Sequence, residues 1–333
     1  MRGDQAKYTQ PCARADVAGP GSGSSPVVSV VIPAYNRERF IGSCIDSALK
    51  QDFHSFEVIV VDDGSTDGTA DVCRSYGGKI RYFRKPNGGA ASALNYGIKK
   101  MEGGWFKWLS SDDELEDGAL RALMSGAGEG AAGVVYGDFT KIDSRGSVIG
   151  RHRERSFASQ DEFVLGLWWH FAGSAGAAVV RRDCFDRVGL FDEKIRYAED
   201  YDWWLRAALV HGIAFRHVPR PVARYRIHPG QITREKLEST SQLRSQIKRN
   251  VASLVLERAM TDARYRKYYA AATKRYRAVA APVAAGAALL AKLPGGDLVE
   301  YWGGRLIPRL SSMAYWASYP PYDPDAPLHP AKD

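Results

Sequence analysis

The chain has 333 residues and a formal net charge of +8, a length that suits one large α/β domain with an extension. Its four cysteines are scattered, with no metal-ligand spacing and no paired framework, which argues against a zinc-bound or disulfide-stapled fold. No hydrophobic signal segment follows Met1, so we expect a cytoplasmic protein with reduced thiols.

Taken in chain order, residues 1–26 are rich in Gly, Ser, Pro and Ala and predict a disordered tail. Residues 27–32 and 57–61 are apolar and rich in β-branched side chains, which is typical of buried parallel strands. Residues 105–109 predict a third strand. Helix-like stretches lie between and after the strands, at about 38–50, 69–75 and 90–101. Strands alternating with helices of this length predict a parallel sheet with right-handed crossovers.

Each of the three strands is followed by polar residues. The first leads into Pro33, Ala34, Tyr35 and Asn36, the second into Asp62 and Asp63, and the third into Ser110, Ser111, Asp112 and Asp113. In a parallel sheet these segments emerge at one edge, which is where ligands bind in open α/β folds. Turn and helix-cap roles remain an alternative for Asp62 and Asp63. Asp112 and Asp113 also suit the N-terminus of a helix starting near Leu115.

Five segments together resemble the family 2 glycosyltransferases, inverting enzymes of the GT-A fold that use nucleotide-sugar donors. The segments are residues 28–36 (VSVVIPAYN), 60–67 (VVDDGSTD), 87–97 (NGGAASALNYG), 111–113 (SDD) and 197–206 (YAEDYDWWLR). The resemblance covers about residues 27–231. It implies an α/β fold of GT-A type: a Rossmann-like, mostly parallel central sheet flanked by helices.

The resemblance also implies a division of the chain. We expect a GT-A domain at 27–232, with a nucleotide-binding half at 27–113 and an acceptor half at 114–232, and a basic helical extension with an irregular tail at 233–333. Residues 233–309 contain fifteen Lys/Arg and six Asp/Glu, so nearly all the excess charge lies in the extension. A solvated helical face is one interpretation. Peripheral contact with anionic lipids is the other.

For the nucleotide, the resemblance assigns Asp63 to the imide N–H of uracil and Tyr35 to stacking on the base. Carboxylate acceptors and aromatic faces suit these contacts. Pro33 belongs to the same first loop, and Asn87 opens a glycine-rich helix start that favours phosphate. The resemblance places Asp112 at the ribose. Many family members carry Arg where this chain has Leu94.

For the leaving diphosphate, the resemblance implies Mn²⁺ or Mg²⁺ on Asp113, with His228 as a further candidate ligand. These ions prefer oxygen ligands and bridge phosphates with few protein carboxylates. The commonest family pattern has Asp where Ser110 stands.

For the acceptor, the resemblance makes Asp200 the general base, supported by Glu199. Trp203 or Trp204 is expected to shape the sugar pocket, and Ser174 to line the acceptor side. Inversion by a single displacement requires such a base next to the attacking hydroxyl. A cap for a helix over residues 201–210 is the structural alternative.

The expected function is metal-dependent transfer of one sugar, from a UDP-sugar, to a hydroxyl of a glycan, a lipid-linked glycan or a small molecule. We expect no nucleic-acid partner. Neither a membrane-spanning stretch nor the Gln-x-x-Arg-Trp motif of processive synthases occurs in the sequence. Two alternatives stay open: a non-catalytic nucleotide-sugar-binding protein of this fold, and a sugar nucleotidyltransferase, although the first loop is not glycine-rich as that chemistry requires.

Overall fold

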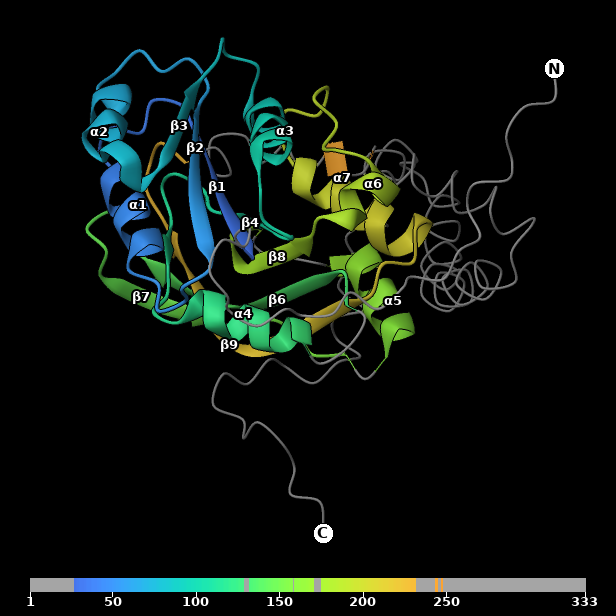
Figure 1. Ribbon diagram of the computed structural model, residues 1–333. Coiled ribbons are helices and arrows are strands. Elements are labelled where there is room, and N and C mark those ends of the chain that lie inside the picture. The colour runs from blue at the N-terminus through green and yellow to red at the C-terminus, as the bar shows by residue number, and fades with distance from the viewer. Residues whose placement is uncertain are drawn as a thin grey trace, which may run out of the picture.

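The computed structural model describes residues 27–128, 132–157, 159–170 and 175–231, together with 243, 244 and 247. Within these residues nine strands form one sheet, in the order β3-β2-β1-β4-β8-β6-β9-β5, with β7 paired to β6 (Figure 1). The sheet runs without interruption through both halves of the predicted domain. This architecture confirms the α/β fold class.

The first half of the sheet is parallel, as the sequence predicts. β1 (Val28–Ala34) lies between β2 (Phe56–Asp62) and β4 (Trp105–Trp108), and β3 (Arg81–Arg84) pairs with the outer side of β2. All four strands point the same way, so the segments that follow β1, β2 and β4 meet at one edge. This is the edge at which the sequence places the site.

The second half of the sheet is mixed. β8 (Ala178–Arg181) runs antiparallel to both β4 and β6 (Val134–Ile142), and the edge strand β7 (Val148–His152) is antiparallel to β6. The long strand β9 (Phe215–Arg226) is parallel to β6, so its C-terminal end returns to the edge where β4 ends. The whole sheet is therefore mixed but mostly parallel, as the resemblance implies.

Helices cover both faces of the sheet. One face packs against α1 (Ile41–Leu49), α2 (Thr69–Ser75) and α4 (Ala119–Gly128). The other packs against α3 (Ala90–Lys100), α5 (Gln160–His170), α6 (Asp183–Val188) and α7 (Glu199–Leu205). Along β2, Val58 and Val60 enter the first core while Ile59 and Val61 enter the second. A strand buried on both faces needs such an unbroken apolar run.

Three boundaries differ from the sequence prediction. The prediction of a helix from about Leu115 is wrong, because Glu114–Leu115 forms the short strand β5, which pairs with β9, and the helix begins at Ala119. α1 begins at Ile41 rather than near residue 38. The helix expected over 201–210 begins at Glu199 and continues beyond Leu205 as a π-helical turn, Arg206–Val210. Tertiary pairing and packing decide such ends, which local composition predicts least well.

The predicted N-terminal tail, and all of the basic extension except three residues, lie outside the described residues. Of those three, Ile247 is buried in the core that contains α7, Leu243 packs against it, and the Arg244 guanidinium carbon lies 5.6 Å from the centre of the Tyr201 ring. Across the described part of the chain, we find no helix with the length and apolarity needed to cross a bilayer.

Candidate active site

The loop after β1 is the first part of the candidate site. Tyr35 is 45% exposed although it is aromatic, which suits a stacking surface. Asn36 adopts a left-handed conformation (φ 52°), and its Oδ1 accepts the Thr66 N–H at 2.8 Å. The Asn36 N–H in turn donates to the Ser65 hydroxyl at 3.0 Å. The loop after β1 is therefore tied to the loop after β2.

The two adjacent aspartates after β2 have different roles. Asp62 is fully buried, and its carboxylate accepts the Ser65 N–H at 2.8 Å and the Tyr82 hydroxyl at 2.7 Å. Asp62 therefore stabilises the turn that follows β2. Asp63 faces the glycine-rich loop, where Gly88 and Gly89 donate their N–H groups to its carboxylate at 2.7–3.1 Å.

Lys85 also binds the Asp63 carboxylate. Its ammonium lies 2.5 Å from Asp63 Oδ1 and also donates to the Pro86 carbonyl at 2.8 Å. Asp63 thus fixes the segment that carries Asn87, whose side chain is exposed at the start of α3. Gly89, with φ 90°, turns the chain into that helix in a conformation that favours glycine.

Asp112 follows β4 and faces the site. Its Oδ2 lies 3.1 Å from His228 Nε2 and 3.7 Å from Arg37 Nε. Burial alone would raise the pKa of Asp112, but the hydrogen bond from His228 and the charge of Arg37 hold the pKa below its ordinary value. Asp112 is therefore a carboxylate at neutral pH, with an imidazole at hydrogen-bond distance.

Asp113 lies deeper than its neighbour. It is 3% exposed, and its Oδ1 accepts the backbone N–H of Arg226 at 2.8 Å. Burial and the charge of Asp112 raise the pKa of Asp113 well above the usual range. Beneath it, the fully buried Lys107 donates to the Gly176 carbonyl and, at 3.1 Å, to the Trp108 carbonyl, while burial lowers the pKa of Lys107 to about 7.

The donor set at this turn fits a hard divalent cation. Asp112 offers a carboxylate oxygen and His228 an imidazole nitrogen within 3.1 Å of one another. No group of three or more His, Cys, Asp or Glu side chains suited to a metal occurs among the described residues. The phosphates of a bound nucleotide and water would therefore have to supply the remaining ligands, as is usual for Mg²⁺.

The two acidic residues that begin α7 are both perturbed by burial. Burial and the charge of Asp200 raise the pKa of Glu199 to about 8, and burial raises the pKa of Asp200. Asp200 Oδ1 accepts the Tyr201 N–H at 2.7 Å. Ala198, immediately before the helix, has φ 65°, a strained backbone position of a kind that clusters at functional sites.

The segment before α7 is attached to α3. The side-chain amide of Asn95 donates to the Phe191 carbonyl and to Glu193, each at 2.9 Å, and its oxygen accepts the Phe191 N–H at 3.0 Å. α3 therefore connects the glycine-rich loop at its start with the segment that leads to Asp200. Leu94, which replaces the Arg common in the family, is fully buried in the core.

The structure contradicts the expected pocket role of the two tryptophans. Trp203 has no exposed surface, its Nε1–H donates to the Gly189 carbonyl at 2.9 Å, and its ring packs 5.1 Å from Phe185. Trp204 is 4% exposed and packs edge-on against Phe215. A ring enclosed in the core has no face to offer a sugar, so both are packing residues. Ser174 lies outside the described residues.

Four cations near the site were missed by the sequence analysis: Arg37, Lys85, Lys107 and Arg226. Arg37, Lys85 and Arg226 are distant in sequence from the acids they approach, whereas Lys107 precedes Asp113 on the same strand and turn. A lone Lys or Arg is usually a solvated side chain, so composition carries no signal for them. The one available hint is that Arg226 belongs to the segment with His228.

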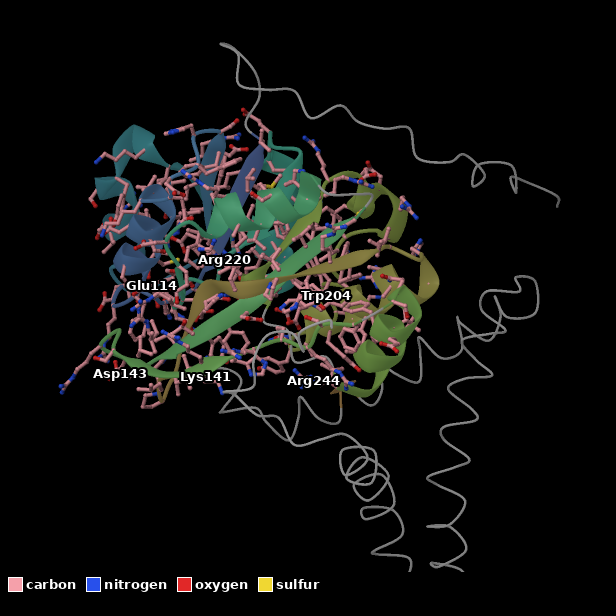
Figure 2. The ribbon with its side chains drawn as sticks, turned by 90° about the horizontal axis from the view of Figure 1, so that it is seen from below. Glu114, Lys141, Asp143, Trp204, Arg220 and Arg244 are labelled. Atoms are coloured by element: carbon pink, nitrogen blue, oxygen red, sulfur yellow. The ribbon has the colours of Figure 1, made fainter. Side chains whose placement is uncertain are left out.

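Figure 2 shows two groups of labelled residues in different halves of the domain. Glu114, Lys141 and Asp143 lie together at one end, whereas Trp204 and Arg244 lie in the other half. The nucleotide and metal candidates are joined to one another by the contacts given above. Asp200 is linked to them through α3 rather than by a direct hydrogen bond.

Comparison with known proteins identifies the family. The sequence model for glycosyl transferase family 2 matches residues 29–189. A Rickettsia typhi protein described as an uncharacterized glycosyltransferase is 36% identical over 222 residues, which are 64% of this chain and 68% of that protein. The fold and the site thus define a GT-A glycosyltransferase, and the chain belongs to glycosyl transferase family 2.

Two solved structures share the fold. TarS 1–349 of S. aureus in complex with UDP-GlcNAc superposes with a TM-score of 0.57 at 22% identity, covering 76% of this chain and 73% of that one. The mannosyltransferase PcManGT of Pyrobaculum calidifontis, in complex with GDP-Man and Mn²⁺, gives a TM-score of 0.50 at 18% identity and 92% coverage of both chains.

Proposed function

We propose that this glycosyltransferase moves a single sugar, with inversion and with the help of a divalent cation, from a UDP-sugar to an acceptor hydroxyl. One observation supports this most strongly: the Tyr35 loop, the Asp63-anchored glycine loop and the Asp112–His228 pair meet at the edge formed by the ends of β1, β2, β4 and β9. The UDP-GlcNAc complex of TarS is consistent with a uridine nucleotide at this edge.

The nucleotide would stack its base on Tyr35 and donate its imide N–H to Asp63. A carboxylate has about four lone-pair positions. Lys85, Gly88 and Gly89 make four contacts with the Asp63 carboxylate, so the imide N–H would take the place of one of them, such as the longer Gly88 contact at 3.1 Å. We infer that Asp63 serves both as the anchor of the loop and as the contact for uracil.

We assign the metal to Asp112 and His228 rather than to Asp113. Asp112 is the ionised member of the acidic pair, and it faces His228, whereas Asp113 is buried and bonded to the β9 backbone. When bound there, Mn²⁺ or Mg²⁺ would neutralise charge on the diphosphate leaving group. Asp113 then supports the turn, whereas the resemblance had placed the metal on Asp113 and the ribose at Asp112.

Asp200 is the proposed base. The acceptor oxygen attacks the anomeric carbon from the face opposite the diphosphate, the bond from that carbon to the diphosphate oxygen breaks, and the hydroxyl proton passes to the Asp200 carboxylate. A raised pKa makes a carboxylate a stronger base near neutral pH. Glu199, with a pKa of about 8, is neutral at pH 7 and is therefore a poor candidate for the base.

The test is a nucleotide-release assay on the full chain. UDP-, GDP-, dTDP- and CMP-sugars are offered with Mn²⁺, Mg²⁺ or EDTA, and with either aqueous or organic cell extract as acceptor source. We expect release of UDP from one UDP-sugar, with acceptor and metal both required. Release that is indifferent to EDTA would remove the metal from the proposal, and release of GDP alone would replace the donor.

The Asp200→Asn variant tests the base. Its release rate should fall at least about 100-fold, because an amide accepts no proton from the acceptor. Its affinity for UDP, measured by calorimetry, should stay within about twofold of wild type. A parallel loss of UDP affinity would show that Asp200 acts in donor binding instead.

A further inference from the structure

Arg226, the last residue of β9, is 3% exposed, and each nitrogen of its guanidinium group contacts another part of the protein. Its Nε donates to the Asp112 carbonyl at 2.8 Å, its Nη1 donates to the Asp143 carbonyl at 3.1 Å, and its Nη2 pairs with Glu114. Its backbone N–H bonds to Asp113 Oδ1 at 2.8 Å. One residue thus contacts all three members of the acidic turn, Asp112–Glu114.

The Glu114 carboxylate supplies the negative charge that faces Arg226. It pairs with Arg226 and, at 3.0 Å, with Arg224 Nε, which stands opposite Glu114 in the β5–β9 register. Arg224 also donates to the Gly146 carbonyl at 2.8 Å. A buried guanidinium is tolerated when its donors are paired in this way. The two arginines therefore fasten the acidic turn to the loop between β6 and β7.

The other side of Arg226 is covered by an aromatic ring shared with the metal candidate. The Arg226 guanidinium carbon lies 5.2 Å from the centre of the Phe40 ring, and the His228 ring lies 4.7 Å from it. Arg226 and His228 thus pack against the same Phe40 ring, and both also contact the acidic turn Asp112–Glu114. The orientation of Asp112 toward His228 depends on where this turn sits.

We propose that Arg226 is a positioning residue that holds the acidic turn so that Asp112 is presented to the metal beside His228. Its donors are directed at the protein, so it acts through Asp112 and not on the nucleotide. This inference rests on the proposed metal-dependent function. Residues that orient metal ligands in this manner change metal affinity about 10–100-fold when replaced.

The test measures Mn²⁺ binding, by calorimetry or electron paramagnetic resonance, to the full chain saturated with UDP. Arg226→Met should weaken Mn²⁺ binding at least about tenfold, because the turn loses both the charge and the planar fork. Arg226→Lys should fall between Met and wild type. Affinity for UDP in EDTA should stay within about twofold, because the base contacts are on other strands.

Arg121→Met is the matched control. Arg121 on α4 also combines an ion pair, to Asp52 at 2.9 Å, with a bond to a backbone carbonyl, but on the exposed surface. Its Mn²⁺ affinity should match wild type within about twofold. Far-UV circular dichroism checks folding. If Arg226→Met does not fold, Glu114→Gln takes its place, and a loss of about threefold or more is expected.

Two different failures can be told apart. If wild type binds Mn²⁺ in the presence of UDP and the folded Arg226 or Glu114 variants bind it equally well, the positioning role is overturned and the proposed function stands. If wild type saturated with UDP binds no Mn²⁺, the metal-dependent function fails and the positioning role fails with it.

Discussion

Burial raises the pKa of two adjacent acids, Glu199 and Asp200, and suits them to different roles. Both lose solvation at the start of α7, and the charge of Asp200 adds to the effect on Glu199, whose pKa reaches about 8. At neutral pH this leaves a protonated glutamic acid next to the proposed base. Glu199 therefore fits a supporting role, since it can donate a hydrogen bond to a neighbouring oxygen.

The raised pKa of Glu199 predicts a pH-dependent stability. The folded protein keeps a proton that the unfolded chain releases above its ordinary pKa of 4.5, so this group lowers stability progressively as pH rises from about 4.5 to about 8. Glu199→Gln should thus gain on wild type with rising pH. We expect an advantage of at least about 1 kcal/mol at pH 8 over pH 5, or about 2–4 °C in Tm.

Thermal unfolding of both proteins between pH 5 and pH 9 measures this difference. Glu102→Gln, on the surface, is the control, and its effect should stay within about 0.5 kcal/mol at every pH. If the difference in stability between Glu199→Gln and wild type were the same at every pH in this range, Glu199 would not be protonated in the folded protein.

At the scale of elements, α3 is the part that joins the two ends of the site. The glycines bonded to Asp63 come immediately before it, and Asn95 in its middle holds the segment that leads to α7. The helix can approach β1 this closely because Gly97 has no side chain. A Cβ at Gly97 would overlap the Val31 side chain of β1.

Gly97→Ala is therefore expected to push α3 away from the sheet. We predict a loss of about 1–3 kcal/mol in the free energy of unfolding, since overpacking of a close contact exceeds the gain in helix propensity. Weaker UDP binding should accompany it, because the glycine loop moves with the helix. Urea unfolding and calorimetry measure the two effects.

Gly78→Ala is the control, because a Cβ at Gly78 meets nothing within 4 Å. It should change stability by less than about 0.5 kcal/mol. If Gly97→Ala were as stable as this control, the close approach of α3 to β1 would not constrain the site.

At the scale of the whole molecule, the site is assembled from segments between residue 35 and residue 228 on one continuous sheet. A ligand bound there should stabilise the entire domain, because it binds the folded chain alone. UDP with Mn²⁺ at 100 times its dissociation constant should add about 2.7 kcal/mol. For a domain of this size that corresponds to roughly 5–10 °C in Tm.

A thermal-shift experiment with UDP, GDP and CDP, each with Mn²⁺ or with EDTA, measures this effect. The largest increase should come from UDP with Mn²⁺, and EDTA should remove most of it. An equal increase from all three nucleotides would mean that Asp63 does not select the base.

The sequence by itself determined the alternation of strands and helices and the edge where the site lies. The β-branched runs at residues 27–32 and 57–61 are typical of central parallel strands buried on both faces, and polar residues follow each one. The family could also be recognised from short sequence motifs that occur in a fixed order along the chain. These features depend on residues close together in the chain.

Tertiary structure alone decided how the two acids after β4 differ in surroundings and charge. Asp112 and Asp113 are equivalent in the sequence, and the arrival of β9 separates them: His228 meets the first, and the backbone of Arg226 meets the second. Trp203 and Trp204 resemble sugar-binding residues in the sequence, but the packing of α7 encloses them. The reason is physical: the pKa values of the two acids depend on partners more than a hundred residues away in the chain, and the exposure of the tryptophans depends on how α7 packs against neighbouring elements, so local composition carries no record of either.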